Sequence, residues 1–280
     1  MIVWIASYPK SGNTWVRGLL SSYLYTNDGI FKFNLLKEIR QFPSKIFFDT
    51  FLNDFSDIKK VSNFWIAAQE KINLIKNKVT FLKTHSALCT LENNPFTNKI
   101  NTKAIIYIVR DPRNLITSIS NHYSQTQKES LNFIINKNKM IMDDDMGGKE
   151  FGVATVLGSW ADHYKSWTNS KIAPIIVIKY EDLINDTVNT FERILNFLNK
   201  LTPIDIDKKK IKKVVNSCNF ETLVNKEKNE GFFESISKDN KKIKFFFLGK
   251  KNNWEDLLDS KIEKEIRVKF QNEMLDLKYI

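Results

Sequence analysis

Four short apolar segments alternate with longer amphipathic segments along the chain, and this alternation limits the fold more than any other feature. Each apolar segment is a nearly continuous hydrophobic run, which is typical of central strands in a parallel sheet. The predicted strands are Ile2–Ser7, Val79–Lys83, Lys103–Val109 and Pro174–Ile178. The predicted helices are Thr14–Tyr25, Pro112–Tyr123, Thr155–Trp167, Thr187–Asn199 and Ser260–Leu275. We therefore expect an α/β fold in three layers, α/β/α, with a central parallel sheet.

The chain has the size and composition of one folded unit. Its 280 residues are 42% hydrophobic, which is enough to bury a core. No internal repeat and no linker rich in Pro, Gly or Ser interrupts it, so we predict a single domain over residues 1–280. Two irregular segments, 31–64 and 124–151, are predicted as surface loops or short helices. Either they cover a pocket or they are ordinary peripheral structure.

The formal net charge of +11 raises the question of an anionic partner: a nucleic acid, a membrane surface or a polyanionic small molecule. The lysines are dispersed and are not arranged in stripes with aromatic residues, so solvated surface is the simpler interpretation and we expect no nucleic-acid partner. No apolar run is as long as a membrane-spanning helix, about 18 residues or more, so we expect no membrane span. The N-terminal apolar run is too short for a signal peptide.

The few cysteines and histidines limit the other classes of site. Cys89 and Cys218 are each isolated, which argues against a disulfide framework and a cysteine-based metal site. His85, His122 and His163 lack the spacing of metal ligands. We therefore expect a soluble, cytoplasmic protein without a metal ion.

The sequence Y-P-K-S-G-N-T-W, residues 8–15, joins the first predicted strand to the first predicted helix. The first turn of a helix has unpaired N–H groups and carries roughly half a positive charge. Gly12 allows a ligand to approach the backbone, Ser11 and Thr14 carry hydroxyl groups, and Lys10 adds a full charge. These features predict a phosphate-binding loop. It is not a Walker A motif, which needs G-x-x-x-x-G-K-[ST], and a plain strand-to-helix turn is the alternative.

Polar side chains also follow the other three predicted strands. Lys83 and His85 end the second strand. Arg110 follows the third strand and Tyr180 follows the fourth. Ser118 comes eight residues after Arg110, about two turns into the next helix. Because ligands bind at the carboxyl ends of parallel strands, we expect these side chains to share a site with the phosphate-binding loop.

The ordered set of motifs resembles the soluble sulfotransferase family, which uses 3′-phosphoadenosine 5′-phosphosulfate (PAPS). The matching segments, between residues 2 and 183, are Y-P-K-S-G-N-T-W, K-T-H, I-V-R-D-P-R-N-L-I-T-S-I and K-Y-E-D-L. A weaker match, G-K-K-N-N-W at 249–254, extends the likeness to most of the chain. The resemblance implies a P-loop-like fold and transfer of a sulfuryl group to a hydroxyl or amine of a small-molecule acceptor.

The same resemblance implies a set of residues that bind the donor nucleotide. They are Lys10, Ser11, Gly12, Asn13, Thr14, Trp15, Arg110, Ser118, Tyr180, Phe220, Gly249 and Lys250. Residues 11–14 hold the 5′-phosphate, and Trp15, Tyr180 and Phe220 contact adenine. Arg110 and Ser118 hold the 3′-phosphate, which suits a guanidinium fork. From chemistry alone, a packed aromatic is an equally good explanation for Trp15 and for Tyr180, and a surface ion pair is the better explanation for Arg110.

The catalytic residues implied by the resemblance are His85, Lys10 and Lys83. His85 is the general base that takes the proton of the acceptor as it attacks sulfur in line. Lys10 stabilises the leaving phosphate, Lys83 holds the sulfuryl oxygens, and the product is 3′-phosphoadenosine 5′-phosphate (PAP). His163 is the second candidate base, although its helical spacing from Trp160 favours packing on a helix face.

The sequence departs from the family at the C-terminal motif, R-K-G-x-x-G-D-W. With Trp254 as the anchor, Phe247 and Leu248 stand where Arg and Lys are expected, and Asn253 replaces Asp. Two cations are therefore missing from a site for a phosphate dianion, unless Lys250 and its neighbour compensate. We expect weaker nucleotide binding and not a different reaction.

The acceptor pocket is predicted to form from residues 31–64, 124–151 and 231–247. Their phenylalanines favour an apolar or aromatic acceptor over a charged polysaccharide. We find no C-terminal dimer motif in residues 260–280, which leaves the oligomeric state open, a homodimer included.

Three other functions compete with this interpretation. An ATP-dependent P-loop phosphotransferase needs a Walker A lysine and a carboxylate for Mg²⁺, and neither is clear in the sequence. A nucleic-acid binder would need a recognisable motif. A non-catalytic nucleotide-binding relative would be expected to lack Lys10 or His85, and both are present.

Overall fold

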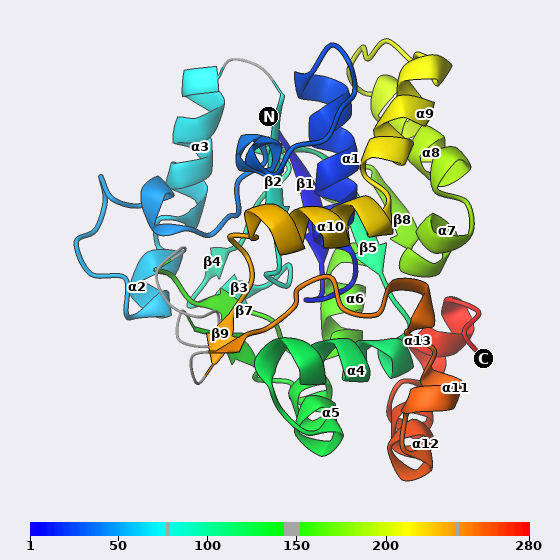
Figure 1. Ribbon diagram of the computed structural model, residues 1–280. Coiled ribbons are helices and arrows are strands. Elements are labelled where there is room, and N and C mark those ends of the chain that lie inside the picture. Colours follow the sequence, from blue (N-terminus) through cyan, green and yellow to red (C-terminus); the bar gives the residue numbers. More distant parts are fainter. Residues whose placement is uncertain (77–78, 143–151, 239–240) are drawn as a thin grey trace.

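Four parallel strands form the central sheet of the computed structural model, which describes residues 1–76, 79–142, 152–238 and 241–280. The strands are β1 (Ile2–Ser7), β2 (Thr80–Thr84), β5 (Thr102–Val109) and β8 (Ile175–Lys179). Their order is β2-β1-β5-β8, so the first strand lies inside the sheet (Figure 1). Trp4 pairs with Leu82 on one side and with Ile105 on the other. The predicted strands and the three-layer α/β architecture are confirmed.

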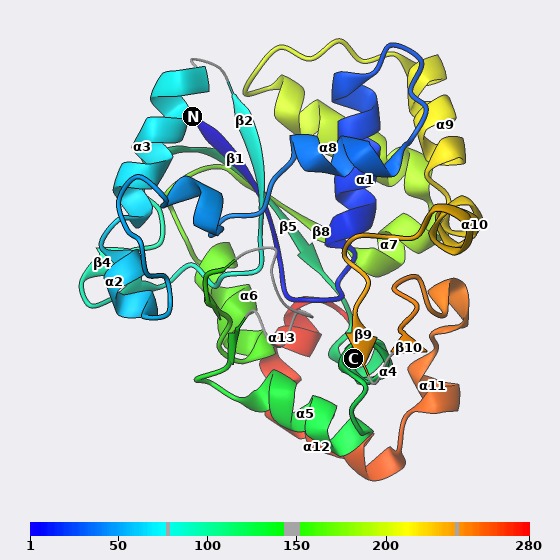
Figure 2. The same cartoon turned by 60° about the vertical axis from the view of Figure 1, so that its left-hand side comes forward.

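The side chains of each strand alternate between two hydrophobic cores, one on each face of the sheet. Trp4 and Tyr107 face one core, together with apolar side chains of α3, α4, α5, α6 and α12. Ile5 and Ile106 face the other, together with side chains of α1, α8 and α9. Figure 2 shows α1 and α8 on one side of the sheet and α3 on the other. Because both faces are covered, the strands are apolar at nearly every position.

The helices and the short strands have the following bounds. The main helices are α1 (Asn13–Tyr25), α3 (Trp65–Lys76), α4 (Pro112–Tyr123), α5 (Gln127–Ile135), α6 (Trp160–Thr168), α8 (Thr187–Asn199), α9 (Lys208–Ser217), α10 (Phe220–Glu230) and α12 (Ser260–Lys269). Shorter helices are η1 (Phe33–Glu38), η2 (Lys45–Phe47), α2 (Ile58–Ser62), α7 (Tyr180–Asn185), η4 (Gly249–Lys251), α11 (Trp254–Leu257) and α13 (Gln271–Asp276). Two-residue strands are β3 (Thr90–Leu91), β4 (Asn94–Pro95), β6 (Met140–Ile141), β7 (Thr155–Val156), β9 (Ser237–Lys238) and β10 (Lys241–Lys242).

Two predicted helices have different bounds in the structure. The helix expected at Thr155–Trp167 begins only at Trp160, because Ser159 caps it by accepting from the Asp162 N–H. Its first residues form β7 instead, which pairs with β6. The helix expected at Ser260–Leu275 divides at the buried Phe270, which ends α12 and precedes α13.

The irregular segments agree in part with the prediction. Residues 31–64 contain only the short helices η1, η2 and α2. Residues 124–151 contain the nine-residue helix α5, whose start is a capping box of Thr126 and Glu129. The turn-forming sequence D-D-D-M-G-G at 143–148, in the second of these segments, lies outside the described residues. Among the described residues, no helix is long and apolar enough to cross a membrane.

Candidate functional site

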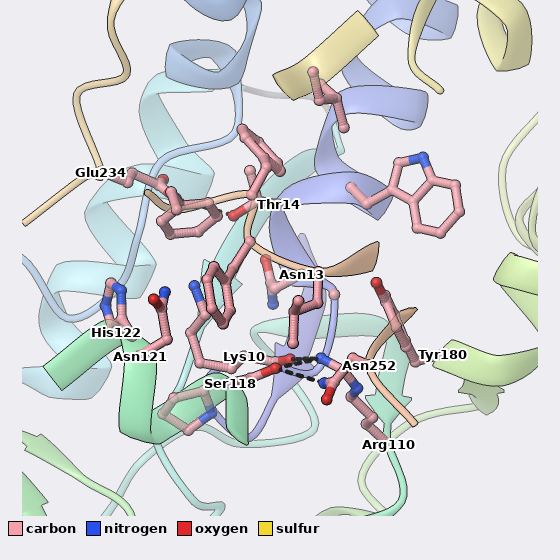
Figure 3. A pocket seen from close by; sticks show the side chains of 18 of the residues that line it. Lys10, Asn13, Thr14, Arg110, Ser118, Asn121, His122, Tyr180, Glu234 and Asn252 are labelled. Carbon is pink, nitrogen blue, oxygen red and sulfur yellow. Dashed lines mark hydrogen bonds between the residues drawn. The ribbon is translucent and has the colours of Figure 1, made fainter. Parts of the chain in front are cut away.

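A pocket of about 1160 Å³, open solvent at its mouth included, lies at the carboxyl ends of the strands (Figure 3). Predicted site residues that line it are Lys10, Gly12, Asn13, Thr14, Trp15, Lys83, His85, Arg110, Ser118, Tyr180, Phe220 and Gly249. Ser11 is buried beside them. Lys250 is exposed and is not part of the lining. The fold therefore brings together residues from four strand ends and the C-terminal region.

The loop between β1 and α1 needs its glycine for two reasons. Gly12 has φ +102°, a left-handed conformation that other residues adopt only with strain. A Cβ at this position would lie 2.6 Å from Cδ2 of Tyr180. Asn13 holds the loop to β1, because its Nδ2 donates to the Ile5 carbonyl at 3.0 Å and to Ser7 Oγ at 3.1 Å. The Asn13 amide nitrogen thus positions the loop instead of pointing at a ligand.

Several buried polar atoms around this loop have no hydrogen-bond partner in the part of the chain that the structure describes. Three of them are donors near the ends of β1 and β5, Lys10 Nζ, Ser11 Oγ and Arg110 Nε, and the loop also holds Asn13 Oδ1, which can only accept, and Trp15 Nε1. Buried donors without partners are uncommon in native proteins and cost free energy, so they mark places where a ligand supplies the partner. The three donors lie around the start of α1, where the helix dipole adds partial positive charge. The Trp15 N–H is already bonded to the Gly12 carbonyl at 3.0 Å. The donor set fits an anionic group such as a phosphate.

Lys10 is held in an unusual environment. Its ammonium group lies 3.5 Å from the centroid of the Phe245 ring, close enough for a cation–π interaction. Burial lowers the pKa of Lys10 to about 7, and the neighbouring Glu234 carboxylate offsets part of that effect. Lys10 therefore changes its charge near neutral pH, whereas an exposed lysine would stay protonated.

A hydrogen-bonded chain of polar groups forms the other end of the pocket. Arg110 Nη1 donates to the Lys10 carbonyl at 3.0 Å and to Ser118 Oγ at 3.1 Å. Asn252 Nδ2 donates to the same Ser118 Oγ at 3.0 Å (Figure 3). The Tyr180 ring lies over the Arg110 guanidinium, 4.1 Å from its carbon. Sequence reasoning missed Asn252, although its place inside the G-K-K-N-N-W match was a usable signal.

The C-terminal motif places apolar side chains at the pocket, as the sequence departure predicts. Phe247 and Leu248 both line it, and Phe247 is 47% exposed. Gly249 has φ +55°, and a Cβ there would lie 2.6 Å from Phe220 Cε1, so Phe220 and Gly249 are packed against each other. Asn253 caps α11 by accepting from the Glu255 N–H, a role that Asp would serve equally well.

His85 lies at the end of β2 with a defined tautomer. Its Nδ1 is 2.8 Å from the Ser7 carbonyl oxygen, which can only accept, so Nδ1 carries the proton. The lone pair is then on Nε2. Burial, and after it the charge of Lys83, lowers the pKa of His85 well below its ordinary value. A neutral imidazole with an unprotonated Nε2 has the form that a general base needs.

His163 has both ring nitrogens occupied. Its Nε2 donates to the His85 carbonyl at 3.0 Å, and its Nδ1 accepts from the Tyr107 hydroxyl at 2.8 Å. The side chain is fully buried, and burial lowers its pKa to about 4. His163 therefore packs on a helix face, as its spacing predicts, and supports the backbone of His85.

Glu234 is a buried carboxylate in the pocket that sequence reasoning missed. It lies 2.5 Å from Arg17 Nη1 and 3.5 Å from Lys83 Nζ, and it accepts from the Thr14 hydroxyl at 3.0 Å. Burial alone raises the pKa of Glu234, but Lys83 and Arg17 outweigh burial and hold it well below its ordinary value. Glu234 is therefore ionised and already paired with two cations. No local motif surrounds Glu234, so only the fold could place it.

Comparison with known proteins agrees with these features. Residues 2–278 match the family model described as "Sulfotransferase domain". The chain is 25% identical over 209 residues to the 3-alpha-hydroxysteroid sulfotransferase of Cavia porcellus. This alignment covers 72% of this chain and 60% of that protein. It is 23% identical over 287 residues to the Sulfotransferase 1B1 of Canis lupus familiaris, which covers 96% and 82%.

A solved structure shows the same fold. Mouse sulfotransferase SULT7A1, complexed with PAP, superposes with a TM-score of 0.59 over 98% of this chain and 84% of that chain, at 22% identity. The 3-alpha-hydroxysteroid relative matches over only about 60% of its own length. Because the family model spans nearly the whole sequence, the chain belongs to the sulfotransferase domain family.

Proposed function

We propose that this protein transfers a sulfuryl group from PAPS to a hydroxyl or amine of a small-molecule acceptor. The observation that carries the proposal is the group of unpartnered donors at the start of α1, beside the neutral His85. The PAP bound in the structure of the mouse relative supports it, and so does the sulfotransferase activity for which the curated relatives are named. A cytoplasmic location and a homodimer stay predictions from the sequence.

The proposed donor site uses the backbone at the start of α1 and side chains around it. Lys10, Ser11 and Thr14 hold the 5′-phosphosulfate end, and Gly12 lets the backbone approach it. Arg110 and Ser118 hold the 3′-phosphate. When bound, PAPS supplies an activated sulfuryl group. The T-shaped pair of Trp15 and Tyr180, with ring centroids 6.0 Å apart, provides aromatic surface for the adenine.

The proposed chemistry assigns a proton acceptor and two cations. His85 Nε2 takes the proton of the acceptor hydroxyl or amine, and the Ser7 carbonyl bonded to Nδ1 stabilises the imidazolium that results. Lys10 and Lys83 place positive charge where negative charge develops on the sulfuryl and leaving oxygens. His163 keeps the His85 backbone in place. These roles require no rearrangement of His85.

A thermal-shift titration with PAP, run beside ATP with Mg²⁺ and beside ADP, tests the proposal. A ligand that binds only the folded protein stabilises it by about 2.7 kcal/mol at a hundredfold excess over its Kd. We expect a shift with PAP and a smaller one or none with the other two. A shift with ATP and Mg²⁺ alone would support a phosphotransferase instead.

A further inference from the structure

His122 is a buried histidine in the last turn of α4 that the proposed chemistry does not use. Its side chain is 5% exposed and lines the pocket. In Figure 3 it lies beside Asn121 and below Glu234, on the opposite side of the pocket from Arg110 and Tyr180. It is therefore on the side of Glu234, which belongs to the segment 231–247 predicted to form part of the acceptor pocket, and away from Arg110 and Tyr180.

The Nδ1 atom of His122 has no hydrogen-bond partner among the described residues, although it is fully buried. Aromatic rings pack against the imidazole on two sides. The Tyr123 ring centroid lies 4.8 Å away and the Phe245 centroid 5.6 Å away, both edge-on. These contacts hold the ring in place but leave the nitrogen unsatisfied.

His163 provides an internal comparison. It is equally buried, yet both of its ring nitrogens form hydrogen bonds, to Tyr107 and to the His85 backbone. An unpaired buried nitrogen costs stability, and a phenylalanine at position 122 would avoid that cost. Because the imidazole of His122 lines the pocket, a ligand that packs against it can complete the unpaired nitrogen.

We propose that His122 Nδ1 binds a second hydroxyl group of the acceptor, separate from the group that reacts at His85. The inference rests on the proposed function. It defines the acceptor class as a ring compound that carries two hydroxyl groups, one of them reactive.

The surroundings of His122 suit this class of acceptor. Ile141 and Phe245 line the same pocket and provide apolar surface for a ring. Burial, and after it the charge of Lys10, lowers the pKa of His122 well below its ordinary value, so the imidazole is neutral. A hydroxyl both donates and accepts, so it pairs with Nδ1 in either neutral tautomer. Sites built to bind a hydroxyl select strongly against analogues that lack it.

The direct test measures acceptor binding to the PAP-loaded protein by calorimetry, so that no turnover is needed. The probes are 4-(hydroxymethyl)-, 4-(2-hydroxyethyl)- and 4-(3-hydroxypropyl)phenol, each paired with the alkylphenol of the same length. In the wild-type protein we expect at least one dihydroxy compound to bind about tenfold more tightly than its partner. His122→Phe should remove that preference, and His122→Asn, which keeps a polar atom near the Nδ1 position, should restore part of it.

Two results would overturn the inference. One is an unchanged preference in His122→Phe. The other is wild-type protein that binds PAP but shows no preference for the dihydroxy member of any pair. Failure of PAP itself to bind would instead contradict the proposed donor, so the two failures can be told apart.

A second measurement uses the folded protein without ligands. His122→Phe should leave the melting temperature unchanged or raise it, because the variant removes an unpaired nitrogen. His163→Phe should lower the melting temperature, because it removes two formed hydrogen bonds. Equal destabilisation by both variants would mean that His122 is satisfied within the fold, and would also overturn the inference.

Discussion

On the side of the pocket formed by the loop 8–15, buried polar atoms lie without partners, whereas on the side that carries Glu234 the charges are already paired. Lys10 Nζ and Ser11 Oγ represent the first side. The Glu234 carboxylate, bonded to Thr14 and ion-paired with Arg17 and Lys83, represents the second. An anion that enters the loop side must therefore share Thr14 and Lys83 with a carboxylate that already occupies them.

The comparison shows two ways to stabilise buried charge before a ligand arrives. On the loop side, the pKa of Lys10 falls to about 7, so part of the Lys10 population carries no charge at neutral pH. Lys83 keeps a counter-ion, Glu234, at 3.5 Å. The lowered pKa and the ion pair both reduce the free-energy cost of burying a lysine in the pocket. Both also weaken the binding of an anion, compared with a fully charged lysine that has no counter-ion.

The largest expected effect separates chemistry from binding. His85→Ala should lower the rate of sulfuryl transfer by about 10² to 10⁴-fold, because the general base is lost. PAP binding should stay nearly unchanged, since neither the loop side nor Arg110 is altered. Initial-rate assays and calorimetry on the same preparation measure both. Full activity of the variant would exclude His85 as the base.

The next effect concerns the loop side alone. Lys10→Ala should lower the transfer rate by about 10²-fold or more, through loss of charge stabilisation. In the wild-type protein, PAP affinity should fall as pH rises through about 7, because Lys10 then loses the proton that attracts the anion. The same titration on Lys10→Ala measures the pH dependence that comes from the ionisation of PAP itself. Parallel pH profiles for the two proteins would contradict this role of Lys10.

Glu234→Gln tests the paired side and should have opposite effects on folding and on binding. Without ligand, loss of the carboxylate leaves Arg17 and Lys83 buried without their counter-ion, which should cost about 3 kcal/mol of unfolding free energy. PAP should bind more tightly, because the competing negative charge is gone. Denaturant unfolding measures the change in unfolding free energy, and calorimetry measures the change in PAP affinity.

Glu227→Gln is the matched control for that variant. Glu227 is also a buried carboxylate, but it accepts from the backbone N–H groups of Phe245 and Phe246 and from Ser235. The charge of Glu227 also acts on Lys10, but less than that of Glu234. Its loss should therefore destabilise the fold and tighten PAP binding less than Glu234→Gln does. If Glu234→Gln binds PAP no more tightly than wild type, the competition between Glu234 and an entering anion is disproved.

The smallest effect should come from the C-terminal motif. The double variant Phe247→Arg, Leu248→Lys should bind PAP several-fold more tightly, because it adds two cations to the pocket lining. The gain is limited because Phe247 is half-exposed, where solvent screens charge. Lys250→Ala should leave PAP affinity unchanged, since Lys250 does not line the pocket. Unchanged affinity in the double variant would argue against the alignment of this motif.

Local patterns predicted most of the sheet and the loop side of the site. The four strand segments follow from apolar runs, and the helix Pro112–Tyr123 follows from its helical pattern with Pro112 at the first position. In the structure Asp111 also caps this helix. The boundary at Ser159 was missed because the residues before it pair with β6, a contact that periodicity does not record. Helix α9 was missed although Asp207 caps it and its apolar residues are regularly spaced.

The sequence alone identified most of the polar side chains that line the pocket, because Lys83, His85 and Arg110 follow directly from the ends of strands. Asn252, which comes from the C-terminal segment, was not among them. Parallel strands bring such ends together whatever the intervening chain contains. Only the tertiary structure decided which partner each buried polar atom has. Glu234 is bonded to Arg17, which is 217 positions away in sequence, whereas the Nδ1 atom of His122 has no hydrogen-bond partner in the described part of the chain. Burial and pairing of this kind depend on packing between distant segments, and no local pattern encodes them.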